Sequence, residues 1–265
     1  LFGRLPALEA VLSHEFKYAE MWEAIATAEN PEALAGEILA HAQELEDAEF
    51  DRGYWSDHWT YLVDLLIQYA AVFPDRLGGL FTQGSYSFFD PTHHVAPRAR
   101  KYVVTPAGMR QYGAVRWSEE KKALIDARPA HRYKVRAQAG RGDIVQTTLL
   151  GKILTLVANK LATLDPFGVG IEMEADRPGW CDALNGLPGI FGSSVNETIE
   201  LKRLVEFTLR AMPAGDGDCP LPGELAVFVA GLQELLHRRG LAPFGFWREA
   251  GTLKESYRAA VFMGF

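Results

Sequence analysis

The stretch 145-VQTTLLGKILTLVANKLATL-164 decides the fold, because its apolar side chains cover most of the circumference of a helix. A helix that is apolar nearly all round is buried, since it has no face suited to water. Residues 57–73, DHWTYLVDLLIQYAAVF, have the same character and end at Pro74, which a helix does not normally continue past. Buried helices of this kind need a surrounding layer of other elements. The sequence therefore predicts a mainly helical, all-α fold.

Further helices are predicted on both sides of these two. Asn30 is a suitable N-cap for the helix that Pro31 opens, and Ser194 and Glu197 fit a capping box at the start of another. A set of long helices joined by irregular loops predicts a concentric helical toroid or a large bundle. The additional helices are expected at residues 7–28, 31–47, 195–211, 222–240 and 251–263.

Residues 78–140 break this helical pattern. They contain short β-like pieces, turn signals and one short helix near 118–127. We expect them to form an irregular insertion, and insertions of this size on a helical scaffold are usually functional.

The chain begins with Leu1 rather than Met and ends just after the apolar run 260-AVFMGF-265. Residues 1–265 are therefore expected to form a single domain that is a fragment of a larger catalytic domain.

Composition and charge exclude several classes of function. The net charge of −7 and the shortness of every basic cluster argue against a nucleic-acid partner. No apolar run reaches the roughly 18 residues that a membrane span needs. Cys181 and Cys219 have neither metal-binding nor disulfide spacing, so free thiols and a cytoplasmic protein are predicted, without a metal. The oligomeric state is not indicated by the sequence.

The segment 168–194 is long for a connection between helices, which needs only about 2–8 residues. It places Trp180 two residues before Asp182, with Asn185 close behind. Such an aromatic ring can stack on a sugar and keep water from the acid, which raises the pKa of the carboxyl group and suits it to protonate a glycosidic oxygen. Alternatively, Asp182 caps the turn at residues 183–186 and the glycines serve only as turn residues.

Three acidic residues precede this motif in 172-EMEAD-176. Glu172, Glu174 and Asp176 alternate, so they share one face if the segment is extended. One of them can supply a second carboxylate to a reaction, or all three form a solvated acidic loop. They do not fit a calcium loop of the EF-hand type, which needs a glycine that is absent here.

The run 179-GWCDALNG-186 resembles the catalytic-acid loop of the cellobiose phosphorylase-like family, glycoside hydrolase family 94, and of the wider six-hairpin glycosidases. The match follows the order Gly, Trp, x, Asp, x, x, Asn, with Gly179 and Cys181 departing from the family pattern. The resemblance implies that Asp182 is the general acid and that Trp180 lines a sugar subsite. It also implies an (α/α)6 catalytic barrel, of which this chain would form a part.

This family resemblance implies an enzyme that cleaves β-linked gluco-oligosaccharides with inversion. In a phosphorylase, inorganic phosphate is the co-substrate and attacks the anomeric carbon directly, so neither a protein base nor a further cofactor is needed. In a hydrolase, a second carboxylate activates water, and Glu172 and Glu174 are the candidates. The alternative is a non-catalytic helical domain of the same fold that binds carbohydrate or acts as a scaffold.

Two further groups of residues are candidates for ligand contacts. A sugar-binding rim or part of the core is formed by Trp55, His58, Trp59 and Tyr61. In 90-DPTHHVAPRARKY-102, two histidines precede two arginines, which suits an anion pocket, although a mobile surface loop is the favoured interpretation. The residues of this second group are His93, His94, Arg98 and Arg100.

Overall fold

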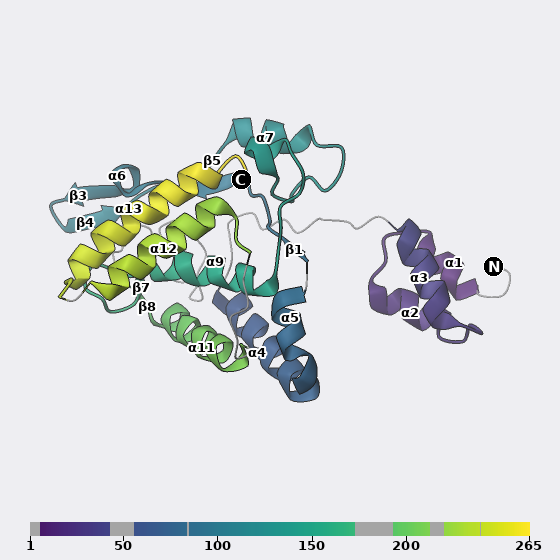
Figure 1. Ribbon diagram of the computed structural model, residues 1–265. Coiled ribbons are helices and arrows are strands. Elements are labelled where there is room, and N and C mark those ends of the chain that lie inside the picture. The colour runs from purple at the N-terminus through teal and green to yellow at the C-terminus, as the bar shows by residue number, and fades with distance from the viewer. Residues whose placement is uncertain (1–5, 43–55, 84, 173–192, 213–219, 239) are drawn as a thin grey trace. The chain divides into compact units, whose positions relative to one another are not determined.

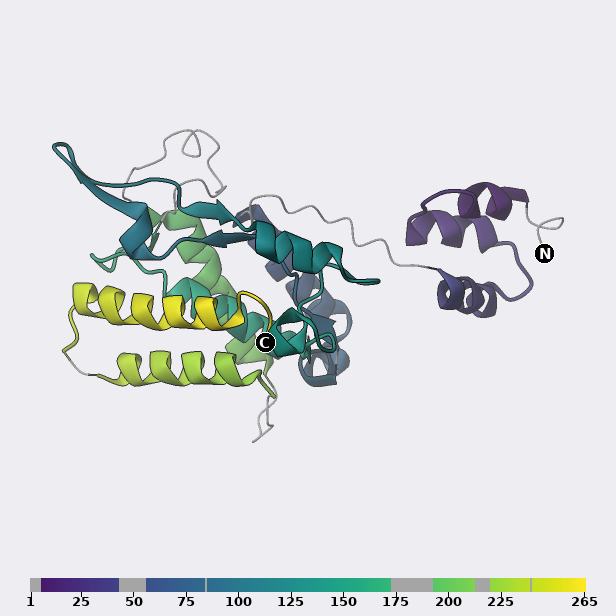
Figure 2. The ribbon, with the colours of Figure 1, turned by 90° about the horizontal axis from the view of Figure 1, so that it is seen from above.

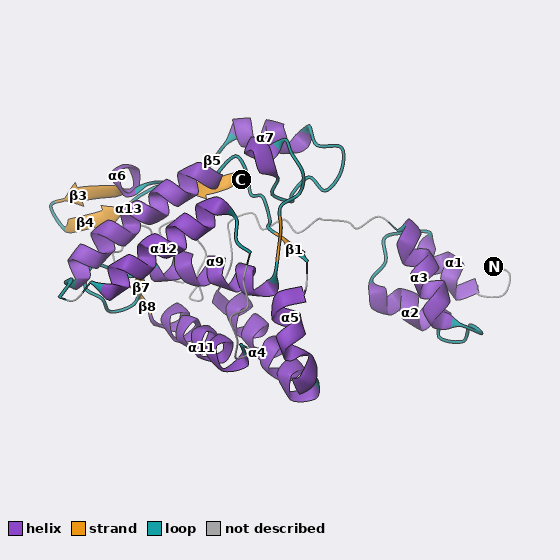
Figure 3. Cartoon of the chain, in the orientation of Figure 1, coloured by secondary structure: helices purple, strands orange, loops and turns teal. Residues whose placement is uncertain are grey.

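Figure 1 shows the computed structural model of the chain, which describes residues 6–42, 56–83, 85–172, 193–212, 220–238 and 240–265. The side chains of residues 6 and 56–59 lie outside this description. The fold is mainly helical, as predicted, with small two-stranded sheets (Figure 3). The chain divides into two compact units, Leu1–Asp47 and Ala48–Phe265, named unit 1 and unit 2 below. The expectation that all 265 residues belong to one larger catalytic domain stays a prediction.

Unit 1 is built on three short helices around a small apolar core. The single helix predicted for residues 7–28 is wrong, because a second helix begins after Lys17, whose backbone N–H donates to the Glu20 carboxylate at 3.0 Å. The predicted cap at Asn30 is confirmed, with its side chain accepting from the Ala33 amide at 3.1 Å. The helices are α1 (Pro6–Leu12), α2 (Tyr18–Ile25) and α3 (Pro31–His41), and the buried core consists of Leu8, Met21, Ile25 and Ala35.

The helices of unit 2 pack around α9 (Leu149–Leu161), the helix of the opening stretch. Ile153 of α9 belongs to a core shared with α4, α5 and α11, whereas Ala158 belongs to a second core shared with α12 and α13. Figure 2 shows α12 and α13 lying side by side. The prediction of a buried helix is thus confirmed for residues 149–161, whereas Gln146–Thr147 at the start of the stretch form a short strand. The other helices are α4 (Ser56–Val72), α5 (Leu77–Gln83), α11 (Val195–Ala211), α12 (Gly223–His237) and α13 (Pro243–Val261), with a 3₁₀ turn at Pro74–Arg76.

The insertion at residues 78–140 has the predicted mixed character. Its strands form pairs, and the short helix predicted near 118–127 is α7 (Glu119–Asp126), capped by Ser118. The strands within it are β1 (Tyr86–Ser87), β2 (His93–Val95), β3 (Tyr102–Thr105), β4 (Gly108–Gln111) and β5 (Val115–Trp117), and the remaining short helices are α6 (Arg98–Lys101) and α8 (Ala137–Gly140). A further strand, β6 (Gln146–Thr147), follows the insertion. The antiparallel pairs are β1 with β6, β2 with β5, and β3 with β4.

The helix α4 differs from its prediction. Its expected burial around most of the circumference is wrong, because Tyr61, Leu65 and Val72 are each about two-thirds exposed. Val63 and Leu66 on the opposite face are buried against the core that α11 and α9 share. Periodicity gave the helix correctly, but which apolar face is covered depends on the packing partners of α4 among the described residues.

Candidate functional site

Glu172 is the predicted catalytic residue that the structure places most clearly. It lies on the two-residue strand β7 (Ile171–Glu172), which pairs antiparallel with β8 (Ser193–Ser194), and Glu172 is directly opposite Ser193. Its backbone N–H donates to the Thr163 carbonyl at 2.8 Å. Only 6% of the residue is exposed. The pairing of β7 with β8 therefore holds together the two ends of the segment 173–192, which contains Asp182.

Three neutral donors hold the buried carboxylate of Glu172. Tyr102 donates its hydroxyl to Oε1, which also accepts from Gln111 Nε2 at 2.8 Å. Trp247 Nε1 donates to Oε2 at 3.0 Å. A carboxylate offers about four lone-pair sites, so the bonds made by the described residues leave one acceptor site, on Oε2. Glu172 is thus fixed in orientation and retains the capacity to accept one more hydrogen bond.

Asp165 connects the turn that precedes β7 to the first residue of β8. Its carboxylate accepts from the amides of Phe167 and Gly170, each at 2.7 Å, and from the hydroxyl of Ser193. Burial by itself would raise the pKa of the Asp165 carboxyl, but these hydrogen bonds to its charged form outweigh burial and hold the pKa below the ordinary value. Asp165 thereby ties the turn before β7 to the start of β8.

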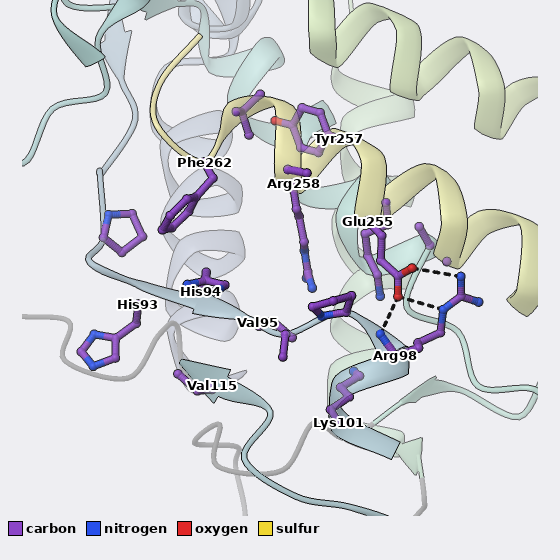
Figure 4. A pocket seen from close by; sticks show the side chains of 18 of the residues that line it. His93, His94, Val95, Arg98, Lys101, Val115, Glu255, Tyr257, Arg258 and Phe262 are labelled. Atoms are coloured by element: carbon purple, nitrogen blue, oxygen red, sulfur yellow. Dashed lines mark hydrogen bonds and ion pairs between the residues drawn. The ribbon is translucent and has the colours of Figure 1, made fainter. Parts of the chain in front are cut away.

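Glu172 opens onto a cavity of about 960 Å³ in unit 2. Its walls are formed by the strand β2, the helix α6 and the side of α13 that faces them (Figure 4). Tyr102 and Trp247 line the cavity beside Glu172, with ring centroids 6.1 Å apart. The volume and the mainly apolar walls with a few polar groups are typical of a small-molecule site.

An ion pair braces the wall of this cavity between α6 and α13. Glu255 accepts from the backbone N–H of Arg98 at 2.7 Å and from its Nε at 2.9 Å (Figure 4). Burial alone would raise the pKa of Glu255, but the bonds from Arg98 hold it below its ordinary value. The guanidinium also lies 5.1 Å from the Trp247 ring centroid. A Cβ at Gly251 would come within 2.6 Å of Arg98, so glycine is what permits this close approach to α13.

The far end of the cavity combines histidine, phenylalanine and a buried acid. His94 packs against Phe262 with ring centroids 4.6 Å apart (Figure 4). Burial, followed by the nearby charges of Arg116 and His93, lowers the pKa of His94. Asp90 also lines this end, and two buried cations behind it balance its charge: Lys121 at 2.6 Å and Arg128 at 2.8 Å.

The structure describes only some of the predicted site residues. Glu172 lines the cavity, whereas Glu174, Trp180, Asp182, Asn185 and Trp55 lie outside the described residues. His58 and Trp59 fall in the first turns of α4, where the description does not extend to side chains.

The interpretation of residues 90–102 as a mobile surface loop is wrong. They contain β2, which pairs with β5, and α6, so they form an ordered wall. His93, His94 and Arg98 line the cavity, whereas Arg100 is exposed and is not among the lining residues. The loop interpretation failed because the strand is only three residues long and its pairing partner is more than twenty residues away.

Sequence reasoning missed the donors around Glu172. Tyr102, Gln111 and Trp247 are 61 to 75 residues away from it along the chain, and no spacing rule connects them. The sequence predicts a β-like piece at residues 101–105, where β3 lies, but not the strand β4 that pairs with it or which side chains reach Glu172. Only the tertiary structure brings these donors together.

Comparisons with known proteins give no family for this chain. No protein-family model matches it, and a search of curated proteins gives no significant match.

Within the described ranges, no three or more side chains of His, Cys, Asp or Glu are grouped so that they could hold a metal ion. None of the helices in the same ranges combines the length and apolar character needed to cross a bilayer.

Proposed function

We propose that this chain is part of a carbohydrate-active enzyme that cleaves β-linked gluco-oligosaccharides with inversion, by phosphorolysis or by hydrolysis. The observation that carries the proposal is the buried carboxylate of Glu172, held by three neutral donors at the wall of a large cavity. Trp247 and Tyr102 beside it offer aromatic surface for a pyranose ring, as sugar sites require. Among the described residues no cation forms an ion pair with Glu172, and burying an acid without such a partner is costly, which favours a functional reason for it.

Asp182 is the proposed general acid. It belongs to the segment 173–192, whose two ends are joined by the β7–β8 pair at the cavity wall. In the reaction, the carboxyl group of Asp182 gives its proton to the leaving glycosidic oxygen as the bond to the anomeric carbon breaks. Trp180, two residues earlier, stacks on the sugar and keeps water from the acid.

Glu172 has a different role in each version of the reaction. In hydrolysis, its free acceptor site on Oε2 takes a proton from the attacking water on the opposite face of the sugar. In phosphorolysis, inorganic phosphate is the nucleophile, and the same site accepts a hydrogen bond from a sugar hydroxyl. The donors to Glu172 orient the carboxylate in both versions.

The proposal extends to the architecture of the whole catalytic domain. We infer that the helices around α9 form part of an (α/α)6 toroid, in which an inner ring of helices carries loops that line the site at one end. Support comes from the burial of α9 between two helical cores and from the resemblance of residues 179–186 to the six-hairpin glycosidases.

The test uses the full-length protein with cellobiose and with β-1,2- and β-1,3-linked glucose disaccharides, each with and without inorganic phosphate. Release of sugar 1-phosphate identifies phosphorolysis, and release of free sugar without phosphate identifies hydrolysis. Asp182→Asn is expected to lower kcat at least about 10²-fold while disaccharide binding, measured by calorimetry, survives. Glu172→Gln is expected to lower kcat by a similar factor in a hydrolase, but chiefly to raise KM in a phosphorylase.

Glu234→Gln is the matched control, because Glu234 is exposed on α12 and away from the cavity lining. It should leave kcat and KM unchanged. An Asp182→Asn variant that retains more than about a tenth of the activity would remove Asp182 from the acid role. Disaccharide binding without turnover by the unmodified protein would contradict the enzymatic proposal and support a carbohydrate-binding domain.

A further inference from the structure

Lys152 of α9 is a partly buried cation that the proposed reaction does not use. It lines the same cavity, and its ammonium donates to the backbone oxygen of Ser87 at 2.8 Å. The ammonium also lies 4.7 Å from the centroid of the Phe88 ring, in the range of a cation–π contact. No carboxylate in the described part of the chain forms an ion pair with Lys152. Burial lowers the pKa of its ammonium, with no anion to offset the effect.

Three buried cations of unit 2 form ion pairs with carboxylates. Lys121 and Arg128 both contact Asp90, and Lys160 contacts Glu197. Charged side chains that are buried are normally paired, because an isolated charge away from water is costly. Lys152 is partly buried, and among the described residues it has no carboxylate partner at a position where the cavity gives a ligand access to it.

A second polar atom near this end of the cavity also has no partner. Nδ1 of His94 is buried and makes no hydrogen bond within the described residues. Phe262 packs on His94, and Phe265 packs on Phe88, the ring beside Lys152, with centroids 5.8 Å apart. All of these side chains line the cavity. Among the described residues, the cavity lining therefore includes a cation without a carboxylate partner, a ring nitrogen without a hydrogen bond, and aromatic rings next to each of them.

The charge of the surroundings favours an anion. Residues 1–47 contain ten acidic and two basic side chains, a net charge of −8, so the remaining residues carry +1 of the total of −7. Among the described residues that line the cavity, Glu255 is paired with Arg98, and Asp90 is paired with Lys121 and Arg128, so neither acid offsets the charge of Lys152.

We propose that the cavity contains an oxyanion-binding site in which Lys152 supplies the positive charge for a carboxylate or phosphate group. The group is either carried on a bound saccharide, as in a uronic acid, or is free inorganic phosphate. An oxyanion at Lys152 supplies the missing counter-charge and accepts the N–H bonds that the single Ser87 carbonyl leaves unused, since an ammonium has three donors. This anion site lies in the same cavity that the proposed function uses. An anion can bind there whether or not the protein cleaves sugars.

The test is calorimetric titration of the full-length protein with inorganic phosphate, with glucuronate and with glucose, the neutral counterpart of glucuronate. Lys152→Met keeps the length and apolar stem of the side chain and removes the charge, so the variant is expected to fold. It should weaken binding of the anion at least about tenfold, as expected for loss of a charge-assisted hydrogen bond. Lys152→Gln, which keeps a polar head without charge, should weaken binding in the same way.

Lys202→Met is the control, because Lys202 lies on α11 with a side chain that is 76% exposed. It should leave anion binding unchanged. Saturable phosphate binding that Lys152→Met removes identifies a free anion, whereas glucuronate binding tighter than that of glucose identifies an anionic saccharide. Absence of anion binding at millimolar concentrations, or equal binding by both Lys152 variants and the unmodified protein, overturns the proposal. These outcomes do not depend on turnover, so they are distinct from a failure of Asp182 as the general acid.

Discussion

At the scale of single residues, Asp165 shows how a buried carboxylate organises the candidate site. Its two oxygens accept from amides of the turn at residues 167–170 and from Ser193 across the strand pair. Only 2% of Asp165 is exposed, so these bonds are protected from water. The carboxylate therefore links the turn before Glu172 to the strand that follows the Asp182 segment.

Asp165 predicts a specific dependence of stability on pH. The pKa of Asp165 is lower in the folded than in the unfolded protein, so its contribution is fully present above the unfolded value, about 3.9, and is lost as the pH falls through the folded value. Asp165→Asn should lower the free energy of unfolding by about 1–3 kcal/mol at pH 7. This difference should shrink below about pH 4. Urea unfolding at a series of pH values measures both effects.

Asp126→Asn is the control for this measurement, because Asp126 is an exposed acid on α7 that pairs with Lys122. It should change the unfolding free energy by less than about 0.5 kcal/mol at every pH. A difference between Asp165→Asn and the unmodified protein that stays constant down to the acid limit would show that the carboxylate charge is not what stabilises the turn.

Part of the candidate site could be predicted at the residue scale. Glu172 could be identified as a candidate because acidic residues alternate after a predicted helix. Ser194 could be identified as a helix cap because a cap has a local sequence signature. The capping box was half confirmed: Ser194 accepts from the Glu197 amide, whereas the Glu197 carboxylate contacts Lys160 of α9. Lys160 was not predictable as its partner, because side-chain pairing between distant helices depends on how those helices pack.

At the scale of elements, α4 illustrates the difference between forming a helix and burying it. Local periodicity and Pro74 define the helix, and the structure places it within one residue of its predicted bounds. Yet neighbouring leucines on α4 have opposite environments: Leu65 is 65% exposed and Leu66 is 5% exposed. The sequence pattern assigns both to the core, because both are equally apolar.

These two leucines provide a matched pair of substitutions. Leu66→Ala should lower the free energy of unfolding by about 2–5 kcal/mol, because it removes buried methyl groups and leaves a cavity. Leu65→Ala should change it by less than about 0.5 kcal/mol, because the side chain remains in water. Denaturant titration of both variants measures the difference. Equal losses would mean that the exposed face of α4 is covered in solution.

At the scale of the whole molecule, the chain contains separate compact units with their own cores. Met21 and Ile25 belong to the core of unit 1, whereas Phe228 and Tyr257 stack in a core of unit 2 with ring centroids 4.8 Å apart. The acidic excess of the chain lies in unit 1, while the cavity lies in unit 2. The two units therefore differ both in charge and in the part they take in the proposed function.

Because each core has its own residues, local stability should be separable by hydrogen exchange. Met21→Ala, at a fully buried position, should speed amide exchange in α1, α2 and α3 and leave exchange in α9, α12 and α13 unchanged. Leu232→Ala, in the core between α12 and α13, should give the reverse pattern. Exchange that rises throughout the chain in both variants would show that the units unfold as one.

The sequence by itself determined the helical class, the positions of most long helices, the caps at Asn30 and Ser194, and Glu172 as a candidate. These features depend on periodicity and on contacts within a few residues, which a linear pattern contains. The tertiary structure alone decided which face of α4 is buried, which donors hold Glu172, and that Lys152 meets no carboxylate in the part of the chain that the structure describes. Those outcomes depend on side chains that lie far apart along the chain, and only the packing of the elements determines their distances.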